Sequence, residues 1–111
     1  TLEKRGTSLG TASLIVMDET ADMVRVAHRL MQFYRHESCG KCTPCREGTG
    51  WIVQMLERLM GEGGCLQDLQ KLRSVCHSMA ATSFCPLAVG AAPPVLSALD
   101  HFPEEFLRYT R

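Results

Sequence analysis

Three cysteines separated by two residues each constrain this chain more than any other feature. Cys39, Cys42 and Cys45 lie within seven residues, so their side chains share a small volume in any compact fold. A fourth cysteine, Cys85, comes much later and is followed directly by Pro86. Three close cysteines and a remote one before a proline are the ligand pattern of a [4Fe–4S] cluster. A fold that uses all four must bring Cys85 back to the first three.

Zinc is the main alternative occupant of the same four cysteines. Thiolates are soft ligands that hold zinc as well as iron–sulfur clusters. Zinc sites usually divide their ligands into two pairs, whereas three of the four cysteines here form one run. Thiol redox chemistry across a two-residue gap is a further alternative, but such motifs usually follow a strand in an alternating α/β fold. The spacing therefore favours a cluster, with a structural zinc domain as the second hypothesis.

Length and composition indicate one compact domain. The chain has 111 residues, of which 45% are hydrophobic, which allows a modest core. Twelve basic and twelve acidic residues balance, and no basic stretch suggests a nucleic-acid partner. No apolar run approaches the roughly 18 residues that a membrane-spanning helix needs. We therefore expect a protein that neither binds nucleic acid nor inserts into a membrane.

The first residues carry no targeting pattern. Residues 1–6 contain neither an initiator methionine nor the charged and apolar regions of a signal peptide. We therefore expect the chain to be a segment of a longer, cytoplasmic protein. Structural disulfides, which are typical of short secreted domains, are not expected among its six cysteines.

Apolar periodicity predicts four helices and a short fifth one. The first should follow a Thr20 N-cap, the second should open at Thr43-Pro44 and end at Gly61, and Pro93-Pro94 should bend the fourth. The expected fold is all-α, a small four-helix bundle whose two cysteine loops can meet at one end. The helices are predicted at about residues 21–35, 43–60, 65–79, 87–99 and 103–109.

A short β-strand is the one predicted element that does not fit a helical bundle. Residues 13–17 form an apolar, β-branched run between Gly10 and Asp18. No later segment reads as a partner strand, and an unpaired apolar strand is unfavourable. We therefore expect this N-terminal strand to belong to a sheet formed by residues that precede the chain.

Residues around the first three cysteines are candidates for tuning the cluster. Gly40 shortens the loop, so backbone N–H groups can turn toward the sulfur atoms and raise the reduction potential. Lys41 and Arg46 place positive charge near a negatively charged cluster, although exposed charges are strongly screened. Ser38, which precedes the first cysteine, belongs to the same group.

The remaining candidates give no catalytic site. Cys65 and Cys76 are predicted as small core residues, although spacing alone leaves either open as a replacement for Cys85. His36, three residues before the first cysteine, could hydrogen-bond the cluster loop. No nucleophilic triad, dinucleotide fingerprint or phosphate-binding loop is present in the sequence. No catalytic residue is therefore expected in this chain.

Residues 38–48, with the sequence SCGKCTPCREG, resemble one family closely. They are similar to the NADH-binding flavoprotein subunit of respiratory complex I, and to the flavoprotein subunits of NAD-reducing hydrogenases and NAD-dependent formate dehydrogenases. The likeness extends to residues 9–18, to 33–39 before the first cysteine, to 83–88 around the remote one, and to 101–102. It covers nearly the whole chain.

The resemblance implies a C-terminal helical domain that holds one [4Fe–4S] cluster through Cys39, Cys42, Cys45 and Cys85. It implies that electrons come from FMN reduced by NADH, both bound in an upstream part absent from this chain. Electrons would continue to iron–sulfur clusters in partner subunits of an NADH dehydrogenase-type complex, which is peripheral to the membrane on its cytoplasmic or matrix side. The isolated chain would not be catalytic.

The resemblance also divides the chain. Residues 1–18 would end an upstream ubiquitin-like domain that includes the predicted strand, and residues 19–111 would form the [4Fe–4S]-binding domain. Residues 89–94 depart from the family, whose members often carry an acidic and an aromatic residue in the helix after the fourth cysteine. This departure leaves the parent complex open among complex I, hydrogenase and formate dehydrogenase.

Overall fold

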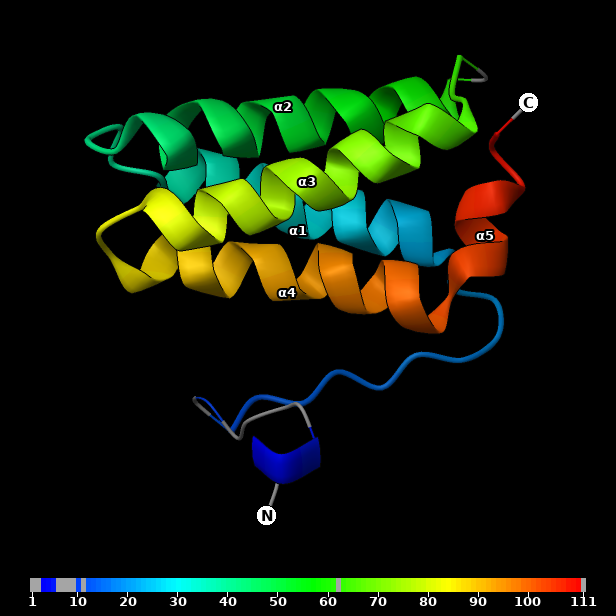
Figure 1. Ribbon diagram of the computed structural model, residues 1–111. Helices are drawn as coiled ribbons and strands as arrows, with labels where there is room; N and C mark the ends of the chain where they lie inside the picture. Colours follow the sequence, from blue (N-terminus) through cyan, green and yellow to red (C-terminus); the bar gives the residue numbers. More distant parts are fainter. Residues whose placement is uncertain (1–2, 6–9, 11, 62, 111) are drawn as a thin grey trace.

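The computed structural model describes residues 3–5, 10, 12–61 and 63–110, and every regular element of more than one residue within them is a helix. Four long helices lie side by side, and a short fifth one closes one end of the bundle (Figure 1). In chain order, a 3-10 turn at Glu3–Arg5 is followed by α1 (Met23–Glu37), α2 (Thr43–Met60), α3 (Leu66–Thr82), α4 (Pro86–His101) and α5 (Pro103–Leu107).

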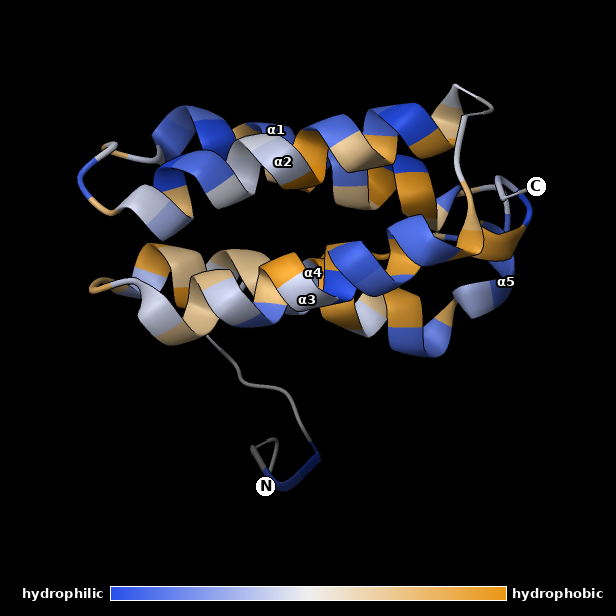
Figure 2. Cartoon of the chain, turned by 45° about the horizontal axis from the view of Figure 1, so that its top comes forward, coloured by the Kyte–Doolittle hydropathy of each residue, from blue (hydrophilic) through white to orange (hydrophobic). Residues whose placement is uncertain are grey.

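Each long helix packs mainly against two neighbours, which closes the bundle. α1 packs against α2 and α4, and α3 packs against the same two helices. Successive helices run in opposite directions, so the α1–α2 and α3–α4 connections lie together at one end (Figures 1 and 2). The all-α four-helix bundle expected from the sequence is confirmed.

The core is built from one side of each helix. Figure 2 shows hydrophilic and hydrophobic residues alternating along the long helices, as burial on one side requires. α4 contributes mainly alanines, whose small side chains let it approach its neighbours closely, and α5 contributes Phe106. The buried apolar residues are Val24, Ala27, Met31, Cys45, Ile52, Val53, Leu56, Leu59, Leu72, Cys76, Met79, Ala88, Ala91, Ala92, Val95, Ala98, Leu99 and Phe106.

Helix ends differ from the predicted ones by up to three residues. The N-cap of α1 is Asp22, whose carboxylate accepts a hydrogen bond from the Val24 N–H at 3.0 Å, and not Thr20. Thr20 is occupied in a preceding turn, where its backbone N–H and its hydroxyl both donate to the Asp18 carboxylate. Gly61 does end α2, but with φ −87° rather than in the left-handed conformation.

The strand predicted at residues 13–17 is not formed. These residues carry no regular structure, and Leu14, Ile15 and Val16 expose 87%, 75% and 86% of their surface. A strand is held by hydrogen bonds to a neighbouring strand, and the part of the chain that the structure describes contains none. The apolar pattern is therefore present without the partner that would make it a strand.

A hydrogen bond joins the two ends of the bundle domain. The hydroxyl of Tyr109, which follows α5, donates to the carboxylate of Asp22, the residue that caps α1. This bond, followed by desolvation and the charge of Asp22, raises the pKa of Tyr109 above its ordinary value. α5 is thereby attached to the start of α1, beside the buried ring of Phe106.

We expect Tyr109→Phe to lower the free energy of unfolding by about 1 kcal/mol, the usual net value of one hydrogen bond. The pKa of Tyr109 is higher in the folded protein than its value of about 10 in the unfolded chain. The stabilisation is therefore complete below about pH 10 and is lost as the pH rises through the pKa of Tyr109 in the folded protein. Urea unfolding at pH 8 and at higher pH checks both effects. Tyr34→Phe is the matched control, since Tyr34 is likewise partly buried against the core, and equal losses in both variants would contradict the prediction.

Candidate metal centre

The bundle brings two cysteine-bearing loops to one end. Residues 38–42 connect α1 to α2, and residues 83–85 connect α3 to α4. Both connections lie at the end opposite to the α2–α3 connection (Figures 1 and 2). Because the helices alternate in direction, this placement follows from the topology and does not depend on side-chain conformations. All four cysteines predicted as ligands therefore lie at the same end of the molecule.

Two helices begin at this end, and each begins at a cysteine. Cys42 is the N-cap of α2 and Cys85 is the N-cap of α4, and neither side chain caps its own helix. Pro44 and Pro86 stand in the first turns, where a missing N–H costs nothing. The free N–H groups of a helix start carry partial positive charge. The two helix starts therefore favour negative charge at this end.

The four thiols differ in exposure. Cys45, in the first turn of α2, is 5% exposed, Cys42 is half-buried, and Cys39 and Cys85 are exposed. All six cysteines are free thiols in this structure. Among the described residues, no three His, Cys, Asp or Glu side chains are placed to hold a single metal ion. The structure thus gathers the four thiols at one end without arranging them around one point.

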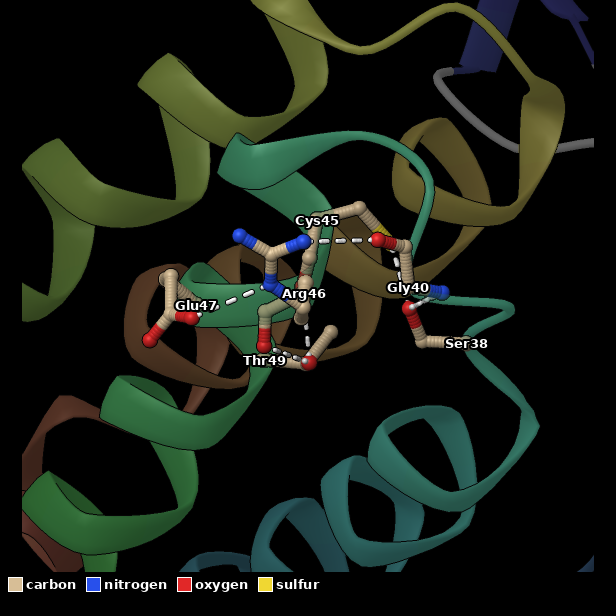
Figure 3. Close-up of polar contacts among 6 residues, drawn as sticks. All are labelled: Ser38, Gly40, Cys45, Arg46, Glu47 and Thr49. Carbon is tan, nitrogen blue, oxygen red and sulfur yellow. Dashed lines mark hydrogen bonds and ion pairs between the residues drawn. The ribbon is translucent and has the colours of Figure 1, made fainter.

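Ser38 contacts the sulfur atom of the buried cysteine. Its Oγ lies 3.4 Å from the Sγ of Cys45 and accepts a hydrogen bond from the Gly40 N–H, also at 3.4 Å (Figure 3). Since the oxygen accepts from Gly40, the hydroxyl proton can point to the sulfur. A hydrogen bond to a thiolate stabilises its negative charge. Ser38 thus links the end of α1 to a ligand candidate on α2.

Arg46 holds the loop between the first two cysteines. Its Nη1 donates to the Gly40 carbonyl at 2.8 Å, and its Nε donates to the Glu47 carboxylate at 3.1 Å (Figure 3). Gly40 has φ +81°, in the left-handed region that favours glycine. The sequence indicated a nearby charge at Arg46, and the structure adds a specific hydrogen bond. Lys41 is exposed on the same loop.

Two hydroxyl groups near the cysteines were not found by sequence analysis. The buried Thr49 donates from Oγ1 to the Cys45 carbonyl at 2.8 Å, one turn earlier in α2. The Oγ of Ser83, in the second loop, is buried and has no hydrogen-bond partner. A threonine within a helix and a serine after one are common, so no pattern in the sequence distinguishes either residue.

The two other cysteines lie away from this end. Cys65 is the N-cap of α3, at the α2–α3 connection, and α3 is 17 residues or about 25 Å long. It therefore cannot replace Cys85. Cys76 is fully buried, as predicted, and burial raises the pKa of its thiol to about 12. The side chain of Cys76 packs within the hydrophobic core and not in either cysteine loop. His36 is exposed.

We expect Cys65→Ser and Cys76→Ala to retain the bound iron of the wild type. Cys76→Ala should also lower the free energy of unfolding by about 1 kcal/mol, because a buried sulfur atom is removed from the core. Iron and sulfide analysis of anaerobically prepared protein, together with urea unfolding, checks both statements. Loss of iron from either variant, comparable to that from Cys85→Ser, would contradict them.

The fold and the cysteines together define a small all-helical domain with four free thiols at one end. Residues 25–109 match the family model of the NADH-ubiquinone oxidoreductase-F iron-sulfur binding region. The chain is 48% identical over 104 residues to the F subunit of NADH-quinone oxidoreductase from Mycobacterium bovis, covering 94% of this chain and 23% of that protein. It is 43% identical over 108 residues to the corresponding F 2 subunit of Rhizobium meliloti, covering 97% and 26%.

A solved structure has the same fold. An NAD⁺-reducing [NiFe]-hydrogenase in the H₂-reduced state contains a region that superposes with a TM-score of 0.82 at 32% identity, covering 86% of this chain and 16% of that one. The chain belongs to the family of the NADH-ubiquinone oxidoreductase-F iron-sulfur binding region. It spans about a quarter of the length of the curated relatives it matches.

The residues present fit the [4Fe–4S] cluster that this family is named for. Four free thiols lie at one end of the bundle, and four thiolates are what a cubane cluster requires. Two helix starts favour the negative charge that such a cluster carries.

None of the helices that the structure describes combines the length and the hydropathy that a membrane span requires.

Proposed function

We propose that this chain is an electron-transfer module that holds one [4Fe–4S] cluster through Cys39, Cys42, Cys45 and Cys85. The observation that carries the proposal is the meeting of both cysteine loops at one end of the bundle (Figure 1). Free thiols and the matching family support it. When bound, the cluster supplies one-electron redox chemistry. The protein's part is to fix its position and to set its potential.

The four ligands have different tasks in this proposal. Cys45 lies on a helix and is buried, so it fixes one corner of the cluster rigidly. Cys42 and Cys85 anchor it to the starts of two helices that pack against the core. Cys39 and Cys85 are exposed, which brings one side of the site to the surface. Electrons can therefore reach and leave the site through a short path.

The first loop supplies hydrogen bonds to the site. A trans peptide points its N–H opposite to its C=O. The Gly40 carbonyl and the Lys41 N–H belong to the same peptide group. Because the carbonyl points to the exposed guanidinium of Arg46, the Lys41 N–H points away from that guanidinium. We propose that this N–H faces the cluster, and that the Ser38 hydroxyl donates to the thiolate of Cys45. Both donors would raise the reduction potential.

The relatives suggest the setting of the module. Their names describe NADH-quinone oxidoreductase subunits, and the structural neighbour is an NAD⁺-reducing hydrogenase. We propose that the chain works in a multi-subunit oxidoreductase of this kind, peripheral to a membrane if the acceptor is a quinone. In that setting FMN and NADH would bind upstream, and further iron–sulfur subunits would be its partners. Residues 1–18 would belong to the upstream domain, where their apolar side chains would find cover.

Low-temperature EPR of dithionite-reduced, anaerobically prepared protein tests the proposal. We expect a signal of a reduced cubane cluster, with about four irons and four sulfides per chain. Anaerobic preparation is needed because oxygen oxidises exposed thiols and clusters. Cys85→Ser should lose most of the iron, because it removes the only ligand from the second loop. About one zinc per chain, with no iron, would overturn the proposal in favour of a structural zinc domain.

Two substitutions of Arg46 distinguish the effect of its hydrogen bond on the cluster potential from the effect of its charge. We expect Arg46→Ala and Arg46→Lys to lower the midpoint potential by about 30 to 60 mV, a three- to tenfold change in the one-electron equilibrium. Lysine keeps the charge but not the fork that reaches the Gly40 carbonyl. Redox-titrated EPR provides the measurement. Lys41→Gln is the matched control, which removes an exposed, screened charge from the same loop and should change little. A wild-type potential in Arg46→Lys would contradict the hydrogen-bond role.

A further inference from the structure

The Ser83 hydroxyl is the exceptional polar group of this molecule. Among the described residues it is the only buried side-chain oxygen or nitrogen without a hydrogen-bond partner. Such groups are rare in folded proteins, because burial removes the bonds that water would supply. The hydroxyl of its neighbour Thr82 is satisfied, since it donates to the Ser78 carbonyl at 2.7 Å. The unpartnered group therefore needs a partner of another kind.

The position of Ser83 points to that partner. It follows α3 as its C-cap and lies two residues before Cys85, in the loop that supplies the remote ligand. Phe84, between them, is 92% exposed. The loop thus turns an aromatic ring to solvent and a hydroxyl inward. The three-residue loop between α3 and α4 therefore holds both the unpartnered hydroxyl and the fourth proposed ligand.

We infer that the Ser83 hydroxyl donates a hydrogen bond to a sulfur atom of the bound cluster, either the Cys85 thiolate or an inorganic sulfide. The inference rests on the proposed function. On the first loop, the Ser38 Oγ lies 3.4 Å from the Sγ of Cys45, whereas the Ser83 Oγ makes no hydrogen bond to a sulfur atom of the described residues before the cluster binds. The cluster would then receive one hydroxyl donor from each loop. A donor to sulfur favours the more negatively charged, reduced state, so Ser83 raises the reduction potential.

Isosteric substitutions test this role. Threonine and valine have the same shape and differ in the hydroxyl, so Ser83→Thr and Ser83→Val form a matched pair, with Ser83→Ala as a smaller variant. We expect Ser83→Val and Ser83→Ala to lower the midpoint potential of the cluster-loaded protein, shifting the one-electron equilibrium about three- to tenfold, or about 30 to 60 mV. Ser83→Thr should keep the wild-type potential. Thr82→Val, which removes an exposed and satisfied hydroxyl one residue away, should also keep it.

Redox-titrated EPR measures the midpoint potential of each variant, and iron analysis measures its cluster content. Equal potentials in Ser83→Thr and Ser83→Val, with full iron content, would overturn the inference and leave the proposed function standing. Absence of iron from the wild type would overturn the proposed function itself. If the valine and alanine variants lose the cluster and the threonine variant retains it, the hydroxyl is required and the inference is supported. Loss from the threonine variant as well would assign Ser83 a steric role instead.

Discussion

Packing of α1 against α4 is the constraint on which the rest of the structure depends. It closes a ring in which each long helix has two neighbours, and it brings the start of α4 beside the end of α1. Fully buried side chains on both helices, such as Met31 and Val95, contribute roughly 1.5 to 3 kcal/mol each to folding. Without the α1–α4 packing, mainly the α2–α3 contact would join the hairpin that carries the first three cysteines to the hairpin that carries Cys85. The hydrophobic core therefore determines which thiols can share one cofactor.

The site combines rigid and irregular backbone in a way that suits electron transfer. An electron-transfer site works best when its geometry is the same in both oxidation states, and ligands on helices are held more precisely than ligands on loops. Cys42, Cys45 and Cys85 lie within or at the start of helices, and only Cys39 lies in the loop itself. Arg46 donates a hydrogen bond to the Gly40 carbonyl and Ser38 accepts one from the Gly40 N–H, and both restrain that loop. The irregular part of the site is thus the part with the most polar support.

The sequence was sufficient to predict features that follow from residue patterns, and it did not predict features that depend on tertiary contacts. Helical periodicity was sufficient for the four-helix bundle, because it is repeated over many residues. Cysteine spacing gave the ligand candidates, which stay a prediction. The N-cap of α1 was assigned to Thr20 rather than Asp22, since both residue types cap helices and only tertiary structure shows that Thr20 serves another turn. The strand at residues 13–17 needed a partner that the described residues do not supply. The burial of the Ser83 hydroxyl has no counterpart in any local pattern.

Residues 89–94 serve the packing of α4 and lie apart from both cysteine loops. Ala91 and Ala92 are buried in the core, while Val89 and Pro93 face outward. α4 continues as a helix through Pro93-Pro94, because core alanines hold it on either side of the missing N–H groups. Cys85 is separated from this stretch by the first turn of α4, which begins at Pro86. The small side chains of α4 therefore determine how closely this helix approaches its neighbours. They do not alter the position of the N-terminus of α4, which carries Cys85 and is determined by the packing of the four helices.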